Sequence, residues 1–156
     1  MSTPVLAQPG TALAMLKIAG LHLVLPQNEI RALESMDNVE RRDAESGRVG
    51  WVRYAQQRWP VYCLSQDLAL LADVPAARRA CVLLGAGQAG YVGMLCDDVS
   101  IVRQSLGPRH ELPDAMRLPE TPVTGLTVLE GETVACLTSA EHLASYLNRL
   151  VSEHGD

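Results

Sequence analysis

Short apolar runs separated by glycine, proline or charged residues follow one another along most of the chain. Runs of this length and composition are typical of β-strands bounded by turns. Ala19-Gly20 and Glu130-Gly131 each separate two such runs, and both dipeptides indicate tight hairpin turns. The pattern predicts about ten strands, over residues 13–18, 21–25, 29–33, 49–54, 58–64, 81–84, 91–96, 99–102, 123–129 and 133–137.

One of these runs is open to two interpretations. Residues 29–33 alternate between polar and apolar side chains, as a strand with one buried face would. Ile30, Leu33 and Met36 also have the spacing of one face of a short helix. Farther along, Gln56-Gln57 is the expected bend between two strands, and residues 107–122, with four prolines, are expected to form a long loop.

Helical signals also occur in two other places. Ser65, followed by an acidic residue and the apolar run 68–71, predicts one or two helical turns that Pro75 ends. Near the C-terminus, Thr138 and Glu141 have the spacing of a capping box, in which the threonine caps the helix and the glutamate reaches back. The amphipathic helix that follows is expected to pack on the sheet through one apolar face and to end at Gly155, and its apolar residues are Leu143, Leu147, Leu150 and Val151.

These elements predict an all-β fold, a barrel or a sandwich, with one C-terminal amphipathic helix. The alternation of strands and helices that builds a parallel sheet is missing. We expect residues 1–11 to be a flexible lead-in, 12–151 a single domain and 152–156 a C-terminal tail.

The composition narrows the class of protein. The 156 residues are 47% hydrophobic, enough for one real core, which must be aliphatic because phenylalanine is absent. The net charge of −5 argues against nucleic acid as a partner, since that binding needs a cationic surface. No apolar run approaches the length of a membrane span, and the N-terminus lacks the basic and apolar regions of a signal peptide. We therefore expect a cytoplasmic protein with reduced cysteines and no direct membrane insertion.

Residues 85–90, Gly-Ala-Gly-Gln-Ala-Gly, match the glycine pattern of a dinucleotide-binding turn. Such a turn must open a helix whose N-terminal amides hold the pyrophosphate. The residues that follow have β-type composition, which favours a glycine-rich hairpin. A small-ligand or nucleotide-binding β-barrel protein that uses the Gly85–Gly90 hairpin is the alternative function.

No other residues combine into a catalytic, metal or cofactor site. Asp97 and Asp98 are adjacent, so in a strand their carboxylates point to opposite faces, and a turn or strand end is the better interpretation. The histidines have no shared metal spacing. A thiol-dependent enzyme remains a third hypothesis, and its candidate nucleophiles are Cys63, Cys96 and Cys136.

The pattern from Leu13 to Leu147, about nine-tenths of the chain, resembles the CheW-like family, and four segments in order carry the resemblance. Residues 18–26 resemble the opening of that family, 93–99 its Gly-Leu-x-Val-Asp-Glu-Val block, and 125–137 its final hairpin. Residues 50–64 have the spacing of its signature Gly-x-Ile-Asn-Leu-Arg-Gly-x-x-x-Pro-Val-x-Asp-Leu. Each motif is weak by itself, but their order and spacing are specific.

The resemblance implies two five-stranded SH3-like barrels that share a core, the second centred on about 80–137. It implies a non-catalytic adaptor that joins the cytoplasmic tip of a methyl-accepting chemoreceptor to the regulatory domain of a CheA-like histidine kinase, in a flagellar or a pilus (twitching) array. A receptor helix would bind in a groove between the barrels. The candidate partner-binding residues are Ile30, Leu33, Val52, Arg53, Tyr54, Ala55 and Gln56.

The chain departs from the family in the central turn. Arg53, Ala55 and Gln56 stand where the family has Asn, Arg and Gly, and Cys63 replaces its Asp. The missing arginine is a receptor-side contact in the family, and interface arginines are frequent hot spots. Arg53, two residues earlier, is the candidate replacement.

Overall fold

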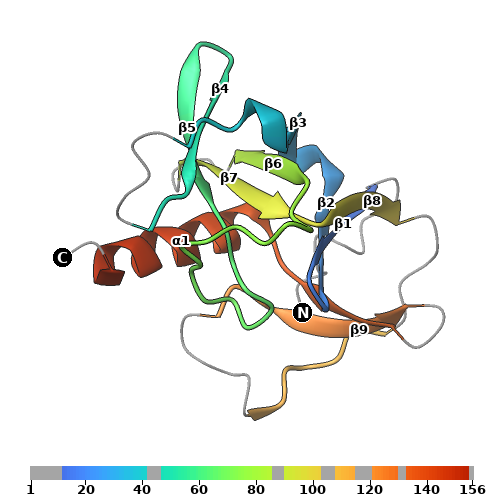
Figure 1. Cartoon of the computed structure of the whole chain (residues 1–156). Coiled ribbons are helices and arrows are strands. Elements are labelled where there is room, and N and C mark those ends of the chain that lie inside the picture. Colours follow the sequence, from blue (N-terminus) through green and yellow to red (C-terminus); the bar gives the residue numbers. More distant parts are fainter. Residues whose placement is uncertain are drawn as a thin grey trace.

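Ten strands in two five-stranded sheets, followed by one long helix, make up the part of the chain that the structure describes (Figure 1). It is a computed structural model, and it describes residues 12–41, 47–85, 90–102, 108–114, 121–129 and 133–154. Sheet A has the order β8-β1-β2-β10-β9, and its strands are β1 (Leu13–Ile18), β2 (Leu21–Pro26), β8 (Asp98–Val102), β9 (Gly125–Leu129) and β10 (Thr133–Leu137). Sheet B has the order β3-β6-β7-β5-β4, and its strands are β3 (Ile30–Ser35), β4 (Gly50–Tyr54), β5 (Gln57–Tyr62), β6 (Ala80–Gly85) and β7 (Tyr91–Cys96). The fold class predicted from the sequence is confirmed.

The two sheets have the same spatial arrangement of strands. Each contains a central antiparallel hairpin, β1-β2 or β6-β7, and one strand of each hairpin pairs in parallel with a second hairpin, β9-β10 or β4-β5. Each sheet also closes on itself, because residues beyond its outer strand pair with the opposite edge. Glu40 pairs with Trp51 in sheet B, and His110 pairs with Leu126 in sheet A. Each sheet therefore forms a small barrel, called barrel A and barrel B below.

The path of the chain differs from the expected division into a first barrel and a second one centred on 80–137. Barrel B is continuous, from β3 to β7, whereas barrel A combines the N-terminal hairpin β1-β2 with β8, β9 and β10. The chain crosses between the barrels twice, from β2 to β3 through a 3-10 turn (Gln27–Glu29) and from β7 to β8 through Asp97. Local sequence could not show this, because strands 13–26 pair with strands more than 70 residues away.

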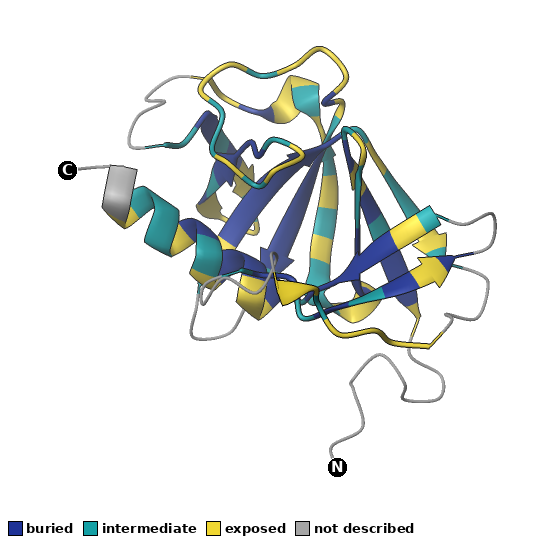
Figure 2. Ribbon diagram, turned by 90° about the horizontal axis from the view of Figure 1, so that it is seen from below, coloured by how far each residue is buried: buried dark blue, intermediate teal, exposed yellow. Residues whose placement is uncertain are grey.

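Most residues of the central hairpins are buried, on both faces of each strand. Figure 2 shows long buried strands, in dark blue, running through the middle of the molecule. In β6, Val82 and Leu84 point into a core shared by the two barrels, while Cys81 and Leu83 fill the interior of barrel B. In β1, Leu16 belongs to the shared core and Leu13 to the smaller interior of barrel A. Burial on both faces explains why these strands are continuous apolar runs.

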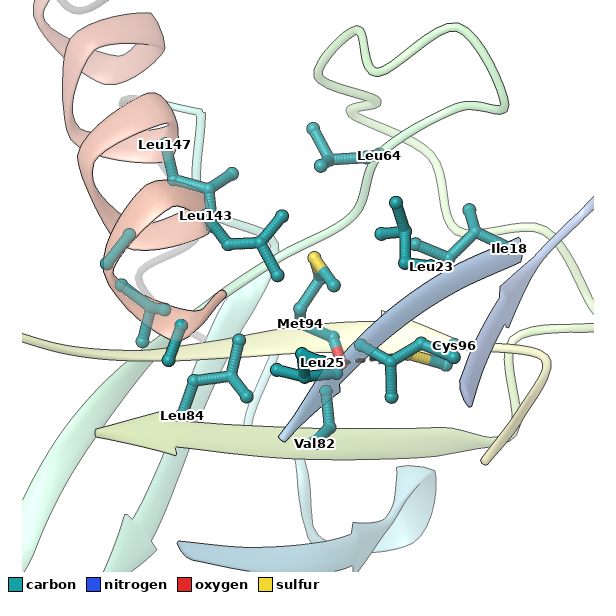
Figure 3. Close-up of a cluster of buried hydrophobic side chains, with 14 of the residues drawn as sticks. Ile18, Leu23, Leu25, Leu64, Val82, Leu84, Met94, Cys96, Leu143 and Leu147 are labelled. Carbon is teal, nitrogen blue, oxygen red and sulfur yellow. Dashed lines mark hydrogen bonds between the residues drawn. The ribbon is translucent and has the colours of Figure 1, made fainter. Parts of the chain in front are cut away.

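Helix α1 (Ala140–His154) covers the shared core (Figure 3). Leu143 and Leu147 pack in one cluster with side chains of both barrels, among them Leu25, Leu84 and Met94. This confirms the amphipathic helix, but its N-terminus differs from the expected capping box. Ser139 caps it, accepting a hydrogen bond from the His142 backbone N–H at 3.1 Å.

Thr138, the residue expected to cap the helix, has another role. Its hydroxyl donates to the Pro122 carbonyl oxygen at 2.8 Å and is buried, so it ties the start of the helix to the strand entering β9. The helix also continues to His154, so the first residues of the tail expected at 152–156 are helical, and Gly155 lies outside the described residues. Thr138 and Ser139 are both able to cap the helix. The packing of Thr138 against Pro122 leaves Ser139 as the cap.

The predicted helical turns after Ser65 are wrong. Ser65 accepts hydrogen bonds from the backbone N–H groups of Asp67 and Ala69, as a cap would. Leu68, however, has a positive φ of 64°, which ends any right-handed helix, and Leu64 pairs with Leu70 as a short antiparallel bridge. The segment is therefore a tight loop, fastened to α1 by the Tyr146 hydroxyl, which donates to the Leu68 carbonyl oxygen at 2.6 Å.

The ambiguous run at 29–33 is a strand, β3, in which half-buried and exposed residues alternate. The bend between β4 and β5 lies at Ala55-Gln56, one residue before the expected position. Both residues have positive φ, 52° and 66°, as the two-residue turn of a twisted hairpin requires. Residues other than glycine are strained in this conformation, because their Cβ lies close to the following carbonyl oxygen.

This strain predicts that Gln56→Gly stabilises the protein, by about 1 kcal/mol in urea unfolding, because glycine adopts positive φ without a Cβ clash. The matched control is Gln57→Gly, next to it but in regular β5, which should destabilise by about 0.5–1 kcal/mol. If both substitutions changed the free energy of unfolding by the same amount, the conclusion that Gln56 is strained would be wrong.

Candidate functional site

The structure places the seven residues predicted to bind a partner in different environments. Val52 is 1% exposed and belongs to the interior of barrel B, so it cannot contact a partner. Ile30 is half-buried and packs against the shared core. Leu33, on the same outer strand β3, is 55% exposed. The alternation of β3 therefore leaves Leu33 as the exposed apolar residue of that strand. The prediction that Val52 contacts a partner is wrong, because its side chain fills the barrel interior.

The remaining four residues lie at the tip of the β4-β5 hairpin, which projects from barrel B (Figure 1). Arg53, Ala55 and Gln56 are exposed. Tyr54 is half-buried and donates its hydroxyl to the Arg31 carbonyl oxygen of β3 at 3.3 Å. That contact brings the hairpin tip next to the start of β3.

Three of the six aromatic residues of the chain gather at this end of barrel B. The ring of Tyr54 meets that of Trp59 edge-on at 5.7 Å between centroids, and Trp59 lies 4.7 Å from Tyr91. The indole of Trp59 donates to the Tyr54 carbonyl oxygen, while Tyr91 is half exposed. Tyr91 was not among the predicted site residues, although an aromatic residue directly after a glycine-rich turn is a usable signal.

A second exposed apolar site lies on barrel A and was also missed. Val128 of β9 and Val134 of β10 are directly opposite each other in the hairpin, and both are exposed, at 44% and 53%. They face outward while Leu129 and Ala135 fill the barrel interior. We call Val128 and Val134 the valine pair. Two adjacent β-branched residues on the outer face of a hairpin are the signal that could have found it.

One buried ion pair joins the crossing between the barrels to two other segments. Arg78, 4% exposed, donates to Asp97 at 2.5 Å and to the Leu64 carbonyl oxygen at 2.9 Å. The second carboxylate oxygen of Asp97 accepts from the Ala19 backbone N–H at 3.0 Å, in the turn of β1-β2. Asp97 is thus the residue between β7 and β8, and Asp98 starts β8, which confirms the strand-end interpretation.

The other crossing is held in a similar way. Glu29 ends the 3-10 turn between β2 and β3, and its carboxylate accepts from the Ala140 backbone N–H at 2.7 Å. A carboxylate at a helix N-terminus also complements the helix dipole. Each crossing between the barrels therefore carries one carboxylate that holds two segments together, and the sequence alone did not reveal these contacts.

The cysteines are suited to packing, not to nucleophilic chemistry. All four are buried and free. Burial raises the pKa of the Cys81 thiol to about 12 and also raises the pKa of the Cys63, Cys96 and Cys136 thiols. A nucleophilic cysteine needs a lowered pKa. These environments disfavour the thiol-enzyme hypothesis.

The glycine pattern joins two antiparallel strands. β6 ends at Gly85 and β7 begins at Tyr91, so the segment connects a hairpin and does not open a helix. Residues 86–89 lie outside the described residues. Within the described ranges, no three His, Cys, Asp or Glu side chains come together as metal ligands, and no helix is long and apolar enough to span a membrane.

The fold defines a double SH3-like β-barrel protein whose accessible features are apolar and aromatic surfaces. The model of the CheW-like domain matches residues 12–147, so the chain belongs to the CheW-like family, a family of non-catalytic scaffold proteins in chemotaxis. Among solved structures, the chain is similar to the scaffolding protein TtCheW from Thermoanaerobacter tengcongensis, with a TM-score of 0.59 and 12% identity over 82% of this chain and 88% of that one. That likeness shows the fold. No curated protein sequence matches the chain.

The buried ion pair predicts a sharp difference between two adjacent arginines. Arg78→Met removes the hydrogen bonds to Asp97 and Leu64 and should cost about 2–4 kcal/mol of unfolding free energy, because the partly buried carboxylate of Asp97 loses its charge partner. Arg79→Met, next to it and exposed, is the control and should change stability by less than about 0.5 kcal/mol. Urea unfolding measures both, and similar values for the two variants would refute the role of the pair.

The raised thiol pKa values predict an alkaline loss of stability. Cys81 binds its proton more tightly in the folded state, with a pKa of about 12 against an ordinary value of 9.0. Its contribution is therefore fully present below about pH 9 and is lost as the pH rises toward 12. In urea unfolding, Cys81→Ala should lose less stability over this range than the unmodified protein.

A thiol-reactive dye provides the matching check at neutral pH. All four thiols should react slowly in the folded protein and rapidly in urea. A single thiol that reacts as fast in the folded protein as in urea would restore the thiol-enzyme hypothesis.

Proposed function

We propose that this protein is a cytoplasmic adaptor that couples chemoreceptors to a CheA-like histidine kinase in a chemosensory array, of the flagellar or the pilus (twitching) type. The observation that carries the proposal is the family match over residues 12–147, on a fold with two equivalent barrels. The function is geometric: the adaptor holds two partners in a fixed relation and makes or breaks no covalent bond.

An adaptor needs two separate contact surfaces, each of about 800 Å² for a stable complex. The exposed apolar residues supply a centre for one surface on each barrel. Leu33 lies on β3 of barrel B, and the valine pair lies on the outer face of barrel A. Apolar side chains surrounded by polar ones are typical of the centre of a protein interface.

We assign the receptor tip to barrel B and the kinase regulatory domain to barrel A. Leu33 would lie at the centre of the receptor contact, and the exposed hairpin tip with Arg53, Ala55 and Gln56 would border it. The valine pair would pack against a barrel of the kinase domain, because hydrophobic side chains on a hairpin face fit the similar face of another small barrel.

A rigid connection between the barrels supports this role. The Arg78–Asp97 pair and the Glu29 contact hold the two crossings, and the shared core lies under α1. A displacement of one barrel would therefore be passed to the other instead of being absorbed by a hinge.

The proposal predicts that two surface substitutions separate the two partners. Leu33→Asp should weaken binding of a chemoreceptor tip at least about tenfold and leave the kinase regulatory domain bound, because a charge buried without a partner is costly in an interface. Val134→Asp should do the reverse. Calorimetric titration with purified domains from the same genome measures both affinities.

Ser145→Asp, on the exposed face of α1, is the control for added charge and should change neither affinity. Binding of neither domain at concentrations of tens of micromolar would refute the coupling function. If each substitution weakened both partners equally, the assignment of the barrels would be wrong.

A further inference from the structure

A layer of three aromatic residues covers one end of barrel B. Trp59 of β5 is buried in the barrel interior and forms the floor of this layer. Tyr54 of β4 meets it edge-on, and the ring of Tyr91 of β7 lies beside it and is half exposed. Aromatic residues with one accessible side are enriched in protein interfaces, because they bury a large apolar area at a small cost in conformational entropy.

Arg31 of β3 lies over the same end of the barrel. Gly85 is directly opposite Tyr91 in the β6-β7 pairing, and the side chain of Arg31 occupies the space that a side chain at Gly85 would need. A Cβ added to Gly85 would clash with Arg31 Nε and lie 3.2 Å from Arg31 Cζ. The register shift between Ile30 and Ala32 leaves Arg31 without a directly opposite residue, and such bulges redirect side chains. The glycine therefore gives the guanidinium group a defined place next to the aromatic layer.

The positive charge of Arg31 is not neutralised. Its side chain is exposed and makes no hydrogen bond or ion pair within the described part of the chain. The two acids nearest to it in sequence have other partners: Glu29 accepts from the Ala140 backbone N–H, and Glu34 accepts from the Asn38 side-chain amide at 2.9 Å. The guanidinium donors are thus available to a partner at the edge of an apolar surface.

Arg31 also lies next to the proposed receptor contact. It is two residues from Leu33 on the outer strand β3, and both side chains are exposed. The Tyr54 hydroxyl donates to the Arg31 carbonyl oxygen at 3.3 Å, so the tip of the β4-β5 hairpin lies beside the start of β3 (Figure 1). One partner bound over β3 would therefore reach Leu33, Arg31 and the aromatic layer together.

Arg53, the arginine that the sequence predicts for a receptor contact, lies differently. It follows the inward-facing Val52 in the alternation of β4, so its side chain points to the outside of the hairpin. There it is directly opposite Arg58, which is also positive. Arg31, in contrast, lies on the side of the hairpin that contains the aromatic layer.

We propose that Arg31, with the ring of Tyr91 beside it, binds a carboxylate of the chemoreceptor tip. The guanidinium group donates two hydrogen bonds to that carboxylate, and an apolar side chain next to the acid packs on the tyrosine ring. This occupant follows from complementarity, because an unneutralised cation at the edge of an apolar surface matches an acidic residue with an apolar neighbour. The inference rests on the proposed function and adds the residue that selects the receptor.

Calorimetric titration of the full chain with the purified receptor tip tests the proposal. Arg31→Gln should weaken binding about tenfold, because charged hydrogen bonds are lost, and should reduce the dependence of the affinity on salt. Arg31→Lys keeps the charge but not the planar donor pair, so its loss should be intermediate. Tyr91→Ala should weaken binding about threefold or more and leave the salt dependence unchanged, because it removes apolar contact only.

The matched control for the loss of one charge is Arg79→Gln. Arg79 is exposed and precedes β6, at the opposite end of that strand from Gly85, and its substitution should change neither the affinity nor the salt dependence. An equal loss in Arg31→Gln and Arg79→Gln would mean that only net charge matters. A larger loss in Arg53→Gln than in Arg31→Gln would make Arg53 the contact. Either result would overturn the proposal.

The stability of the variant and its binding to the other partner are measured alongside. Arg31→Gln should unfold at the same urea concentration as the unmodified protein and should keep its affinity for the kinase regulatory domain, because the side chain is exposed on barrel B. A loss of kinase binding with intact receptor binding would assign this surface to the kinase. A dimer in sedimentation velocity that Arg31→Gln abolishes would assign it to a second copy of the chain. Both outcomes would reject the receptor carboxylate.

Failure of this inference and failure of the coupling function give different results. If the unmodified protein bound no receptor tip at tens of micromolar, both would be wrong. If it bound the tip and Arg31→Gln bound equally well with unchanged salt dependence, the coupling function would stand and the role of Arg31 alone would be wrong.

Discussion

Burial of the two central hairpins on both faces is the constraint on which the rest of the structure depends. β1-β2 and β6-β7 must each fill the interior of their own barrel with one set of side chains and the shared core with the other. Neither barrel can be separated without exposing half of those side chains to water, at a cost of roughly 1.5–3 kcal/mol for each large aliphatic one. The barrels and α1 therefore form one cooperative unit, although each has a complete sheet of its own.

Hydrogen bonds at the two crossings between the barrels hold the packed barrels in one fixed orientation. At one, the Arg78–Asp97 pair binds the end of β7 to the turn of β1-β2 and to the Leu64 carbonyl oxygen. At the other, Glu29 binds the end of β2 to the first turn of α1. The proposed adaptor function, in which the protein holds two partners in a fixed relation, requires such rigidity and requires no reactive groups. The polar side chains at the crossings, Arg78, Asp97 and Glu29, accordingly join neighbouring segments of the chain.

Surface and interior have separate tasks in this chain. The interior holds the aliphatic side chains and the thiols, whose raised pKa values keep them in the unreactive form. The accessible apolar, aromatic and cationic side chains lie on strands at or next to the sheet edges, at Leu33, the valine pair and the β4-β5 hairpin. Outer strands have one face free of core packing, so they can carry contacts without loss of stability.

The sequence by itself determined the β-class, the strands, the position of α1 and the family, because alternation, turn residues and motif spacing are local properties. It did not determine which strands pair. That β1-β2 joins β8–β10, that Asp97 meets Arg78, and that Val52 faces inward while Leu33 faces outward were decided only in the tertiary structure. The cap of α1 and the loop after Ser65 were settled there too. The reason is physical: the strand pairing, the Arg78–Asp97 pair and the inward direction of Val52 depend on contacts between segments distant along the chain, which neighbouring residues do not encode. At the cap and the loop several local side chains could fill the same role, and the packing of the whole chain selected one of them.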